Sequence, residues 1–323
     1  MRQYLLRRLL LMIPLLLGIS FISFVIMQLA PGDPASLSVG MNSKIDPSYI
    51  VKLRQSYGLD DPLMVQYWHW LQRICRLDFG NTFHDNRPVI TVIAERLPAT
   101  LLLSGLSEAL LFLVAVPLGI LAAYYHNRWY DRFITFFSFV GFSMPSFWLA
   151  LLLMLLFGVK MNLLPVSGMT STEAEYLPWA DRMWDLVSHL ILPLVVTTFG
   201  GLASVSRYAR TSMLEVIRQD YIRTARAKGL SEFQVIFHHA LKNALIPIVT
   251  LAGLSLPNLI GGSFIIETIF SWPGMGRLGF ESVLSHDYPL LMGIGVISAF
   301  LTLMGNLLAD LAYAWLDPRI RYD

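Results

Sequence analysis

None of the residues that commonly do chemistry stands in the spacing of a nucleotide-binding or metal site. Residues 274–279 read GMGRLG and fit the dinucleotide pattern G-x-G-x-x-G, but no strand is expected before them and they fall in a loop between apolar segments. His238 and His239 are adjacent rather than four residues apart, and HExxH does not occur, so no metal site is predicted. The phosphate-binding pattern G-x-x-x-x-G-K-[ST] is also missing, so the sequence does not predict nucleotide hydrolysis by this chain.

A nucleophile and a base at membrane depth are the elements of the one enzyme hypothesis that the sequence offers. Ser143 lies in GFSMPS within an apolar segment, and His189 lies near the start of another. Together they raise the alternative of an intramembrane serine protease. Small residues in membrane helices more often permit close packing, and a single histidine near an interface is more often simply hydrogen-bonded. We therefore expect no catalytic residues, and proteolysis by the purified chain would overturn that expectation.

The composition places the chain in a membrane. Hydrophobic residues make up 55% and charged residues only 14% of 323 residues, against about 25% charged in soluble proteins. The mean hydropathy is +0.57. A formal net charge of +2 does not suggest a nucleic-acid partner. Cys75 is the only cysteine, which excludes an intrachain disulfide and a thiolate metal cluster.

Six segments are long and apolar enough to cross a bilayer as helices, which need about 20 residues. The first is too long for a signal peptide, whose apolar region has about 7–15 residues, and no small-x-small cleavage site follows it. Several segments contain prolines that should kink them: Pro117, Pro145, Pro193 and Pro257. The sequence thus predicts an all-α integral membrane protein with spans at residues 9–30, 101–125, 133–158, 187–205, 244–266 and 288–308.

The distribution of Lys and Arg predicts the direction of the spans. The segment before the first span, the loops 126–132 and 206–243 and the segment after residue 308 carry 14 of these residues, whereas the short loops 159–186 and 267–287 carry 3. Loop 31–100 is too long for this count, which applies to loops below about 60 residues. Both termini and the basic loop 206–243 are therefore predicted to be cytoplasmic.

The long loop after the first span is predicted to fold outside the membrane. Its 7 basic residues are matched by 7 acidic ones, it is rich in aromatics, and residues 47–77 have helical spacing. The expected divisions are a terminus and first span at 1–30, a helical extracytoplasmic loop at 31–100, a five-span core at 101–308 that includes loop 206–243, and a cytoplasmic tail at 309–323.

Loop 206–243 should contain two helices joined by a sharp turn. Asp220 can cap a short helix over residues 221–228, and Gly229 can take the left-handed conformation that ends it. Ser231 and Gln234 form an S-x-x-Q capping box for the second helix. One face of the second helix is expected to carry Phe233, Ile236, Phe237, Ala240 and Leu241.

The short helix needs support, because isolated helices below about 12–15 residues are marginal in water. Ile222 and Ala225 offer a small apolar ridge for a groove in a partner. The cations Arg223, Arg226 and Lys228 suit anionic lipid or an acidic protein surface. The alternative is that the loop is basic only because membrane topology requires it, but that alternative leaves the helix–Gly–cap–helix pattern unexplained.

Four stretches resemble one family over essentially the whole chain: LLRRLLLMIPLLLGISFISFVIMQLAPGDP, SMLEVIRQDYIRTARAKG with the following ALKNALIP, and ETIFSWPGMGRL. They are similar to ATP-binding-cassette importer permeases of the dipeptide, oligopeptide and nickel family, B-type subunit. RTARAKGL resembles the family's EAA loop, although Arg223 stands where Glu is typical and the proline lies further from the glycine. The resemblance assigns contact with an ATPase to Arg223, Thr224, Ala225, Arg226, Ala227, Lys228 and Gly229.

The resemblance also implies partners. They are a homologous second permease subunit in a heterodimer, two cytoplasmic ATP-binding subunits and an extracytoplasmic solute-binding protein, in a bacterial or archaeal inner membrane. The chain would need no cofactor and catalyse no reaction itself. The implied cargo is a di- or oligopeptide, with import of nickel or glutathione as an alternative of the same architecture. An autonomous channel or secondary transporter is the alternative from another class.

Glu108 is the one acid placed deep in a predicted span. A charge at the bilayer centre costs about 2.5–3.5 kcal/mol on insertion scales, so Glu108 should face the bundle or water. It would either line a translocation path or make a packing hydrogen bond with another span. Asp310, at the cytoplasmic end of the last span, can reach the interface and is less informative.

Overall fold

A computed structural model of the 323-residue chain describes residues 2–29 and 61–316. This part of the chain is mostly helical and has no strand, apart from an isolated bridge between Asn81 and Pro88. The all-α prediction is thereby confirmed in its coarse form. Four continuous helices are long and apolar enough to cross a membrane: α1 (Arg2–Leu29), α5 (Val89–Tyr124), α8 (Trp179–Ile217) and α16 (Tyr288–Leu316).

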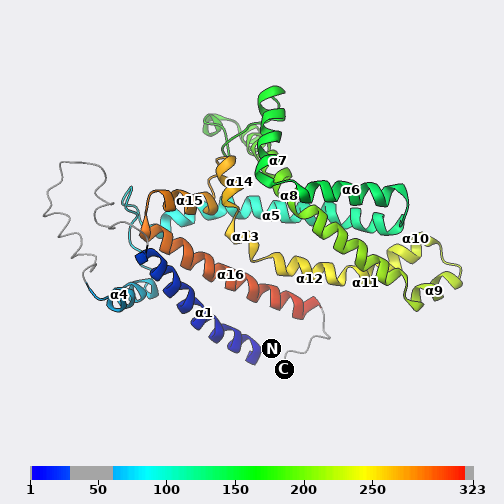
Figure 1. Ribbon diagram of the computed structural model, residues 1–323, viewed down its shortest axis with the longest axis horizontal. Coiled ribbons are helices and arrows are strands. Elements are labelled where there is room, and N and C mark those ends of the chain that lie inside the picture. Colours follow the sequence, from blue (N-terminus) through cyan, green and yellow to red (C-terminus); the bar gives the residue numbers. More distant parts are fainter. Residues whose placement is uncertain (1, 30–60, 317–323) are drawn as a thin grey trace.

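The predicted third span is bent rather than straight. It consists of α6 (Trp129–Ser143), α7 (Ser146–Leu153) and a π-helical stretch, Met154–Lys160. The two halves meet at an angle of more than 40°, and α7 turns away from α6 in Figure 1. Pro145 is the residue before α7, and Met144 is extended because the residue before a proline is pushed out of the helical region.

The predicted fifth span, residues 244–266, is also not one helix. The chain runs through α10 (Glu232–Gln234), a π-helical turn (Val235–Ala240), α11 (Leu241–Ala244) and α12 (Ile246–Ser255), then α13 (Asn258–Gly261) and α14 (Phe264–Ile269). Pro257 precedes α13, and Gly262 adopts a φ of +61° between α13 and α14. Pro117 and Pro193, by contrast, lie inside continuous helices, so only two of the four prolines mark a break.

Two helices begin or end well outside the predicted spans. α5 begins at Val89 after Pro88, so residues 89–100 belong to the same continuous helix as the predicted second span. α8 has 39 residues and is about 58 Å long at 1.5 Å per residue, roughly twice the hydrocarbon thickness. Hydropathy marks only the length of helix that fits the bilayer, which explains both differences. In the predicted loop helix at 47–77, α4 (Leu63–Cys75) is helical, and the predictions for residues 30–60 and 317–323 lie outside the described residues.

The core of the molecule is the packing of α5 along α8, with α6 beside them, while α1 packs on α16 (Figure 1). Leu111 and Ala115 of α5 meet Leu202 and Val205 of α8. Gly119 allows close approach, because a Cβ there would collide with the backbone of Ser206. Small residues therefore set the separation of the two central helices.

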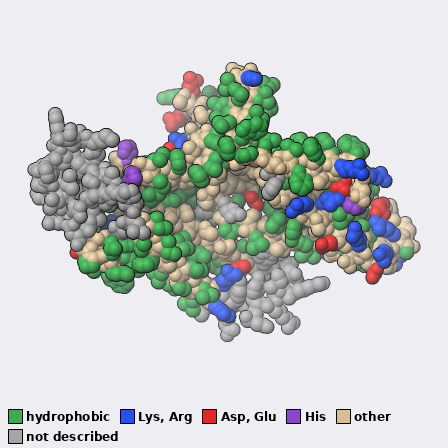
Figure 2. All heavy atoms as spheres, viewed as in Figure 1, with side chains coloured by type: hydrophobic (Ala, Val, Ile, Leu, Met, Phe, Trp, Pro, Cys, Tyr) green, Lys and Arg blue, Asp and Glu red, His purple; other side chains and the backbone are tan. Residues whose placement is uncertain are grey.

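An ion pair joins α6 to α8 near one end of this core. The carboxylate of Asp131 is buried and accepts two hydrogen bonds from the Arg210 guanidinium, at 2.7 and 2.8 Å. His126 lies 3.3 Å from the same carboxylate, and the Asn127 N–H donates to it at 2.9 Å. Charged side chains gather around this end and around α9 and α10, whereas apolar side chains cover the middle of the face drawn in Figure 2.

Candidate functional site

The basic loop folds as a short helix followed by a left-handed turn. α9 (Asp220–Ala227) follows Gln219, which occupies the N-cap position, so the prediction that Asp220 caps the helix is wrong by one residue. Gly229 has a φ of +80°, which confirms the predicted left-handed conformation. Its N–H donates to the Arg226 carbonyl at 2.9 Å. In Figure 1 this turn forms the end of the molecule opposite α4 and α15 (Met275–Leu284).

The second helix begins with the predicted capping box and then departs from regular α geometry. The Ser231 hydroxyl accepts from the Gln234 N–H, and the Gln234 side chain accepts from the Ser231 N–H at 3.2 Å. The π-helical turn that follows has more residues per turn than an α-helix, and therefore changes which side chains share a face. Ile236 and Ala240 are buried, whereas Phe233 and Phe237 are exposed, so the residues predicted to share one face are divided between the interior and the surface.

The apolar ridge of α9 faces the chain's own helices, which corrects the expectation that it is open to a partner. Ile222 is fully buried and Ala225 is 6% exposed. Both belong to a cluster that includes Met213 of α8, Val235 and Ile236. Burying a side chain such as that of Ile222 stabilises by about 1.5–3 kcal/mol. Internal packing therefore supports a helix that is too short to be stable alone.

Two hydrogen bonds tie the loop to the ends of the neighbouring helices. The Asn243 side-chain amide donates to the Tyr221 hydroxyl at 2.8 Å, which joins α11 to α9. The Ser212 hydroxyl of α8 donates to the Ala244 carbonyl at 2.9 Å. The first bond therefore links α9 to α11 at the start of the fifth span, and the second links α8 to the same short helix.

An ion pair closes the turn at Gly229. Arg226 donates to both carboxylate oxygens of Glu232, at 3.1 and 2.6 Å. The hydrogen bonds to this carboxylate raise the pKa of Arg226 above its usual value. Arg223 pairs more loosely with Asp220, at 3.4 Å, and both side chains are largely exposed. The sequence did contain a signal for the Arg226–Glu232 pair, because the two residues have opposite charges and stand on either side of the predicted turn at Gly229.

The exposed surface of the loop contains most of the predicted contact residues. Ala225 is the exception, because it is turned inward. Phe233 and Phe237, 66% and 45% exposed, have ring centroids 4.5 Å apart with the ring planes tilted by 30°, and they add an apolar patch to this surface. The predicted residues that remain exposed are Arg223, Thr224, Arg226, Ala227, Lys228 and Gly229. We call these six together with Phe233 and Phe237 the loop surface.

Glu108 lies in the middle part of α5 and is half-buried. Among residues 2–29 and 61–316, none forms a hydrogen bond or ion pair with it. Its neighbour Ser107 does make an interhelical contact, 2.7 Å from the Thr197 hydroxyl of α8. The interhelical hydrogen bond at this level of α5 therefore belongs to Ser107.

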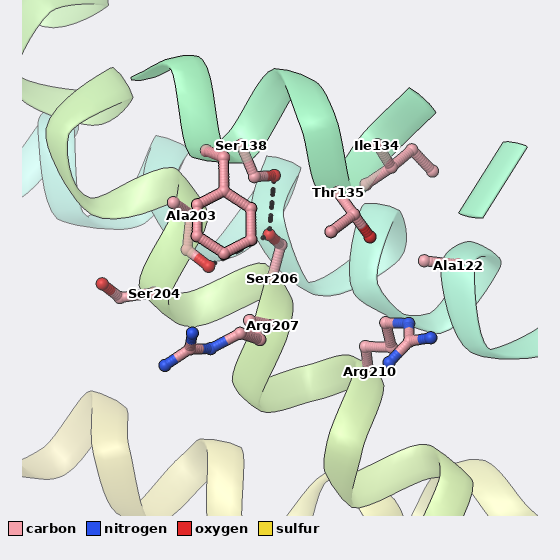
Figure 3. Close-up of a pocket in the computed structure, with 10 residues that line it drawn as sticks. Ala122, Ile134, Thr135, Ser138, Ala203, Ser204, Ser206, Arg207 and Arg210 are labelled. Atoms are coloured by element: carbon pink, nitrogen blue, oxygen red, sulfur yellow. Dashed lines mark hydrogen bonds between the residues drawn. The ribbon is translucent and has the colours of Figure 1, made fainter. Parts of the chain in front are cut away.

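A cavity of about 220 Å³ lies between α5, α6 and α8 (Figure 3). Its walls carry hydroxyl groups, and Ser138 and Ser206 face each other at 3.3 Å. Arg210 at its edge is already paired with Asp131. Among the described residues that line this cavity there is no histidine or cysteine.

The residues of the protease alternative are engaged locally. The Ser143 hydroxyl donates to the Phe139 carbonyl one turn earlier, at 2.9 Å. His189 Nδ1 lies 2.8 Å from the Asp185 carbonyl oxygen. Within residues 61–316 no hydrogen bond joins Ser143 to His189, and the described chain has no group of three potential metal ligands.

Comparison with known proteins gives a consistent result over both parts of the chain. Residues 115–322 match the family described as "Binding-protein-dependent transport system inner membrane component", and residues 1–104 match the N-terminal component of the same system. The oligopeptide transport system permease protein AppB of Bacillus subtilis is 44% identical over 323 residues, covering 100% of both chains. The dipeptide transport system permease protein DppB of Alkalihalophilus pseudofirmus is 40% identical, again with complete coverage of both.

A solved structure supports the fold. It is entitled "Inward facing conformations of the MetNI methionine ABC transporter", and the match has a TM-score of 0.55 at 17% identity over 71% of this chain and 97% of that one. The helical, multi-pass architecture, the matched family and the full-length relatives agree. The chain therefore belongs to the family of binding-protein-dependent transport system inner membrane components.

Proposed function

We propose that this chain is the permease subunit of an ATP-driven ABC importer that moves di- or oligopeptides across the cytoplasmic membrane. The observation that carries the proposal is the full-length identity of 44% and 40% to permeases named for oligopeptide and dipeptide transport. The absence of a phosphate-binding pattern from the sequence agrees with hydrolysis by a separate subunit.

In this proposal the loop surface is where an ATPase subunit binds. Exposed cations, a small Ala227 and the neighbouring rings of Phe233 and Phe237 give a surface that is both charged and apolar, as contact residues in protein interfaces often are. Ala225 acts differently from the other predicted contact residues. It packs inside the chain and connects the bound helix to α8 and the fifth span.

The mechanism follows from how α9 is attached. ATP binding closes the ATPase dimer and carries α9 with it. Ile222, Ala225 and the Tyr221–Asn243 hydrogen bond transmit that displacement to the helices on either side of the loop. The bent third and fifth spans then change their angles at Pro145 and near Leu245, which opens the path alternately to each side. Coupling requires that the two states differ in their contacts with the ATPase.

The other partners follow from the same architecture. A homologous second permease subunit supplies the other half of the path, two ATP-binding subunits sit in the cytoplasm, and an extracytoplasmic solute-binding protein delivers the peptide. The excess of Lys and Arg in loop 206–243 and the terminal segments supports cytoplasmic termini. The chain itself performs no catalysis, and Glu108 is proposed to line the path.

Site-directed crosslinking tests this proposal. Cys75 is the only cysteine, so a Cys75→Ser chain is a suitable background for single cysteines at positions 223, 228 and 233. Each should crosslink to a nucleotide-hydrolysing protein in membranes that import peptide. Tyr176, which is 86% exposed on a different loop, provides the matched control position and should not. Continued transport without any crosslink from the three positions would overturn the proposal.

Uptake measurements separate the remaining alternatives. A nickel or glutathione importer of the same architecture would transport those solutes and not peptides. An autonomous channel or secondary transporter would run without any ATPase, and its rate would not depend on ATP. The proposal requires ATP-dependent peptide uptake by the assembled complex.

A further inference from the structure

A carboxylate is buried where the outer end of the fifth span meets α5. Glu267 of α14 is 1% exposed. The Thr100 hydroxyl of α5 donates to its Oε1 at 3.1 Å, and the Arg277 N–H of α15 donates to its Oε2 at 2.9 Å. A buried carboxyl group is costly unless its oxygens are hydrogen-bonded, and here each oxygen has a donor from a different element.

Thr100 connects the same three elements from the α5 side. Its hydroxyl oxygen accepts from the Met275 N–H at the start of α15, at 2.7 Å, while the hydroxyl donates to Glu267. The fully buried Trp272 adds a second attachment one residue away on α5, because its indole N–H donates to the Ala99 carbonyl at 2.8 Å. The α14–α15 hairpin is therefore held to one point on α5 by polar contacts as well as by packing.

Three glycines leave the space that the carboxylate occupies. A Cβ on Gly262 would lie 2.5 Å from Glu267 Oε1, and one on Gly274 would lie 2.5 Å from both Cδ and Oε2. A Cβ on Gly276 would lie 2.7 Å from the Phe264 backbone nitrogen and 3.0 Å from Oε2. These separations are far below ordinary contact distance. The first two glycines of GMGRLG, Gly274 and Gly276, thus leave room for a carboxylate of their own chain.

Gly262 also marks the break between α13 and α14, with a φ of +61°. Glu267 therefore touches the break in the fifth span, α5 and the start of α15 at once. We refer to Glu267, Thr100, Gly262, Gly274 and the Arg277 N–H as the Glu267 clamp. None of its members lies in the loop surface, and α9 lies at the right end of Figure 1, well away from α14 and α15.

We propose that Glu267 is a positioning residue that holds the α14–α15 hairpin and the broken end of the fifth span against α5, and that transport is coupled to ATP hydrolysis only while it does so. The proposal rests on the function proposed above. Movement of α9 reaches the fifth span from the cytoplasmic end. The clamp fixes the other end of that span. Displacement of the cytoplasmic end therefore bends the span and reshapes the path, instead of shifting the whole span.

The test compares Thr100→Val with Thr100→Ser in the complete transporter. Valine keeps the shape of threonine and removes the hydroxyl, whereas serine keeps the hydroxyl. Thr100→Val removes the hydroxyl that donates to Glu267 and accepts from the Met275 N–H, so it should lower peptide transport by roughly tenfold or more. ATP hydrolysis should continue, so the number of ATP molecules hydrolysed per peptide should rise. Thr100→Ser should restore a ratio near that of the wild type.

Gly274→Ala and Gly279→Ala provide a second, independent pair. A Cβ at Gly274 collides with Glu267, while a Cβ at Gly279 has no atom within 4 Å in the described structure. Gly274→Ala should uncouple like Thr100→Val, and Gly279→Ala should not. Each variant is quantified in the membrane, so that transport is expressed per assembled complex.

Three results would overturn this inference. The first is transport at the wild-type rate by Thr100→Val and Gly274→Ala, and the second is an equal effect of each variant and its control. The third is a decrease in transport and ATP hydrolysis that matches a decrease in the amount of protein in the membrane, which would show a purely structural role. Failure of the wild-type complex to import peptide with ATP would instead overturn the proposed function, so the two failures are distinguishable.

Discussion

Arg226 at the end of α9 and Glu232 at the start of α10 form two hydrogen bonds, 3.1 and 2.6 Å long, across the left-handed turn at Gly229. Glu232→Gln removes the charge of the acceptor and leaves Arg226 in place. Both side chains are nearly half exposed, and exposed pairs contribute at most about 1 kcal/mol, so stability should hardly change. Transport should fall by no more than about fivefold, which corresponds to 1 kcal/mol.

Peptide uptake per complex and thermal unfolding check this prediction together. Glu281→Gln is the matched control, since Glu281 is exposed to the same degree and pairs with Arg277 at 2.6 Å on α15. The prediction is that the Arg226–Glu232 pair shapes the turn and contributes little to stability. A large decrease in the melting temperature of Glu232→Gln would contradict it.

Gly229→Val should disrupt the turn through the backbone and not through a clash. No atom of the described residues lies within 4 Å of a Cβ at this position, but its φ of +80° costs an L residue about 1–2 kcal/mol. The chain should remain in the membrane while uptake and binding-protein-stimulated ATP hydrolysis decline about 5–30-fold. Gly229→Asn is the control, because asparagine tolerates the left-handed region. Equal transport by the valine and glycine chains would refute the role of the turn.

Glu108→Gln tests whether a carboxylate on α5 lines the path. If the charge meets the ammonium group of a peptide, its removal should weaken uptake or apparent affinity. Asp181→Asn, at an exposed acid in the first turn of α8, is the control and should have no effect. Uptake is measured at several pH values. Unchanged rates and affinities throughout would assign Glu108 to packing.

Local chemistry predicted the parts of the loop that depend on adjacent residues. Gly229 takes the left-handed conformation and Ser231 forms its capping box, because both depend on a few neighbouring residues. Ile222 and Phe233 were placed on the wrong faces. Their exposure depends on where α8 lies and on a π-helical turn, and neither can be derived from 3.6-residue periodicity.

The same distinction holds for the spans. Hydropathy found six apolar segments, but it could not find the start of α5 at Val89 or the break at Gly262, because helix length beyond the bilayer is set by packing. The clamp was missed entirely. Glu267 and Thr100 are 167 residues apart, and GMGRLG was assessed only as a ligand-binding pattern.

Asp287 should make stability depend on pH. It is 2% exposed before α16, and its carboxylate accepts from the Phe83 N–H at 2.9 Å and the Leu290 N–H at 3.2 Å. Burial raises the pKa of this carboxyl above 3.8, and the nearby charge of Asp85 acts in the same direction. The folded state therefore binds the proton more tightly than the unfolded state. Protonation of Asp287 adds its full contribution to the free energy of unfolding below pH 3.8, and this contribution is lost as the pH rises through the folded-state pKa.

The measurement is the melting temperature of the wild type and of Asp287→Asn at a series of pH values from below 3.8 to neutral. Asparagine does not titrate, so the melting temperature of the wild type should rise relative to that of the variant as the pH falls. Other carboxyl groups titrate in both chains and cancel in the difference. A difference that stays constant, or that grows in favour of the wild type as pH rises, would contradict the sign of the shift.

Phe233 and Phe237 should contribute binding energy to the ATPase while costing the isolated chain little. They are 66% and 45% exposed, and neither belongs to the buried cluster around Ile222, so Phe233→Ser with Phe237→Ser removes little of the internal core. Burying one phenylalanine side chain contributes about 1.5–3 kcal/mol, and each 1.4 kcal/mol changes a dissociation constant tenfold. The double variant should therefore lose the ATPase during purification in mild detergent, although its melting temperature stays close to that of the wild type. Trp184→Ser, at a 70% exposed aromatic near the other end of α8, should retain it. Equal recovery of ATPase with the double variant and the control would mean that the cations of α9 bind the ATPase without the aromatic pair.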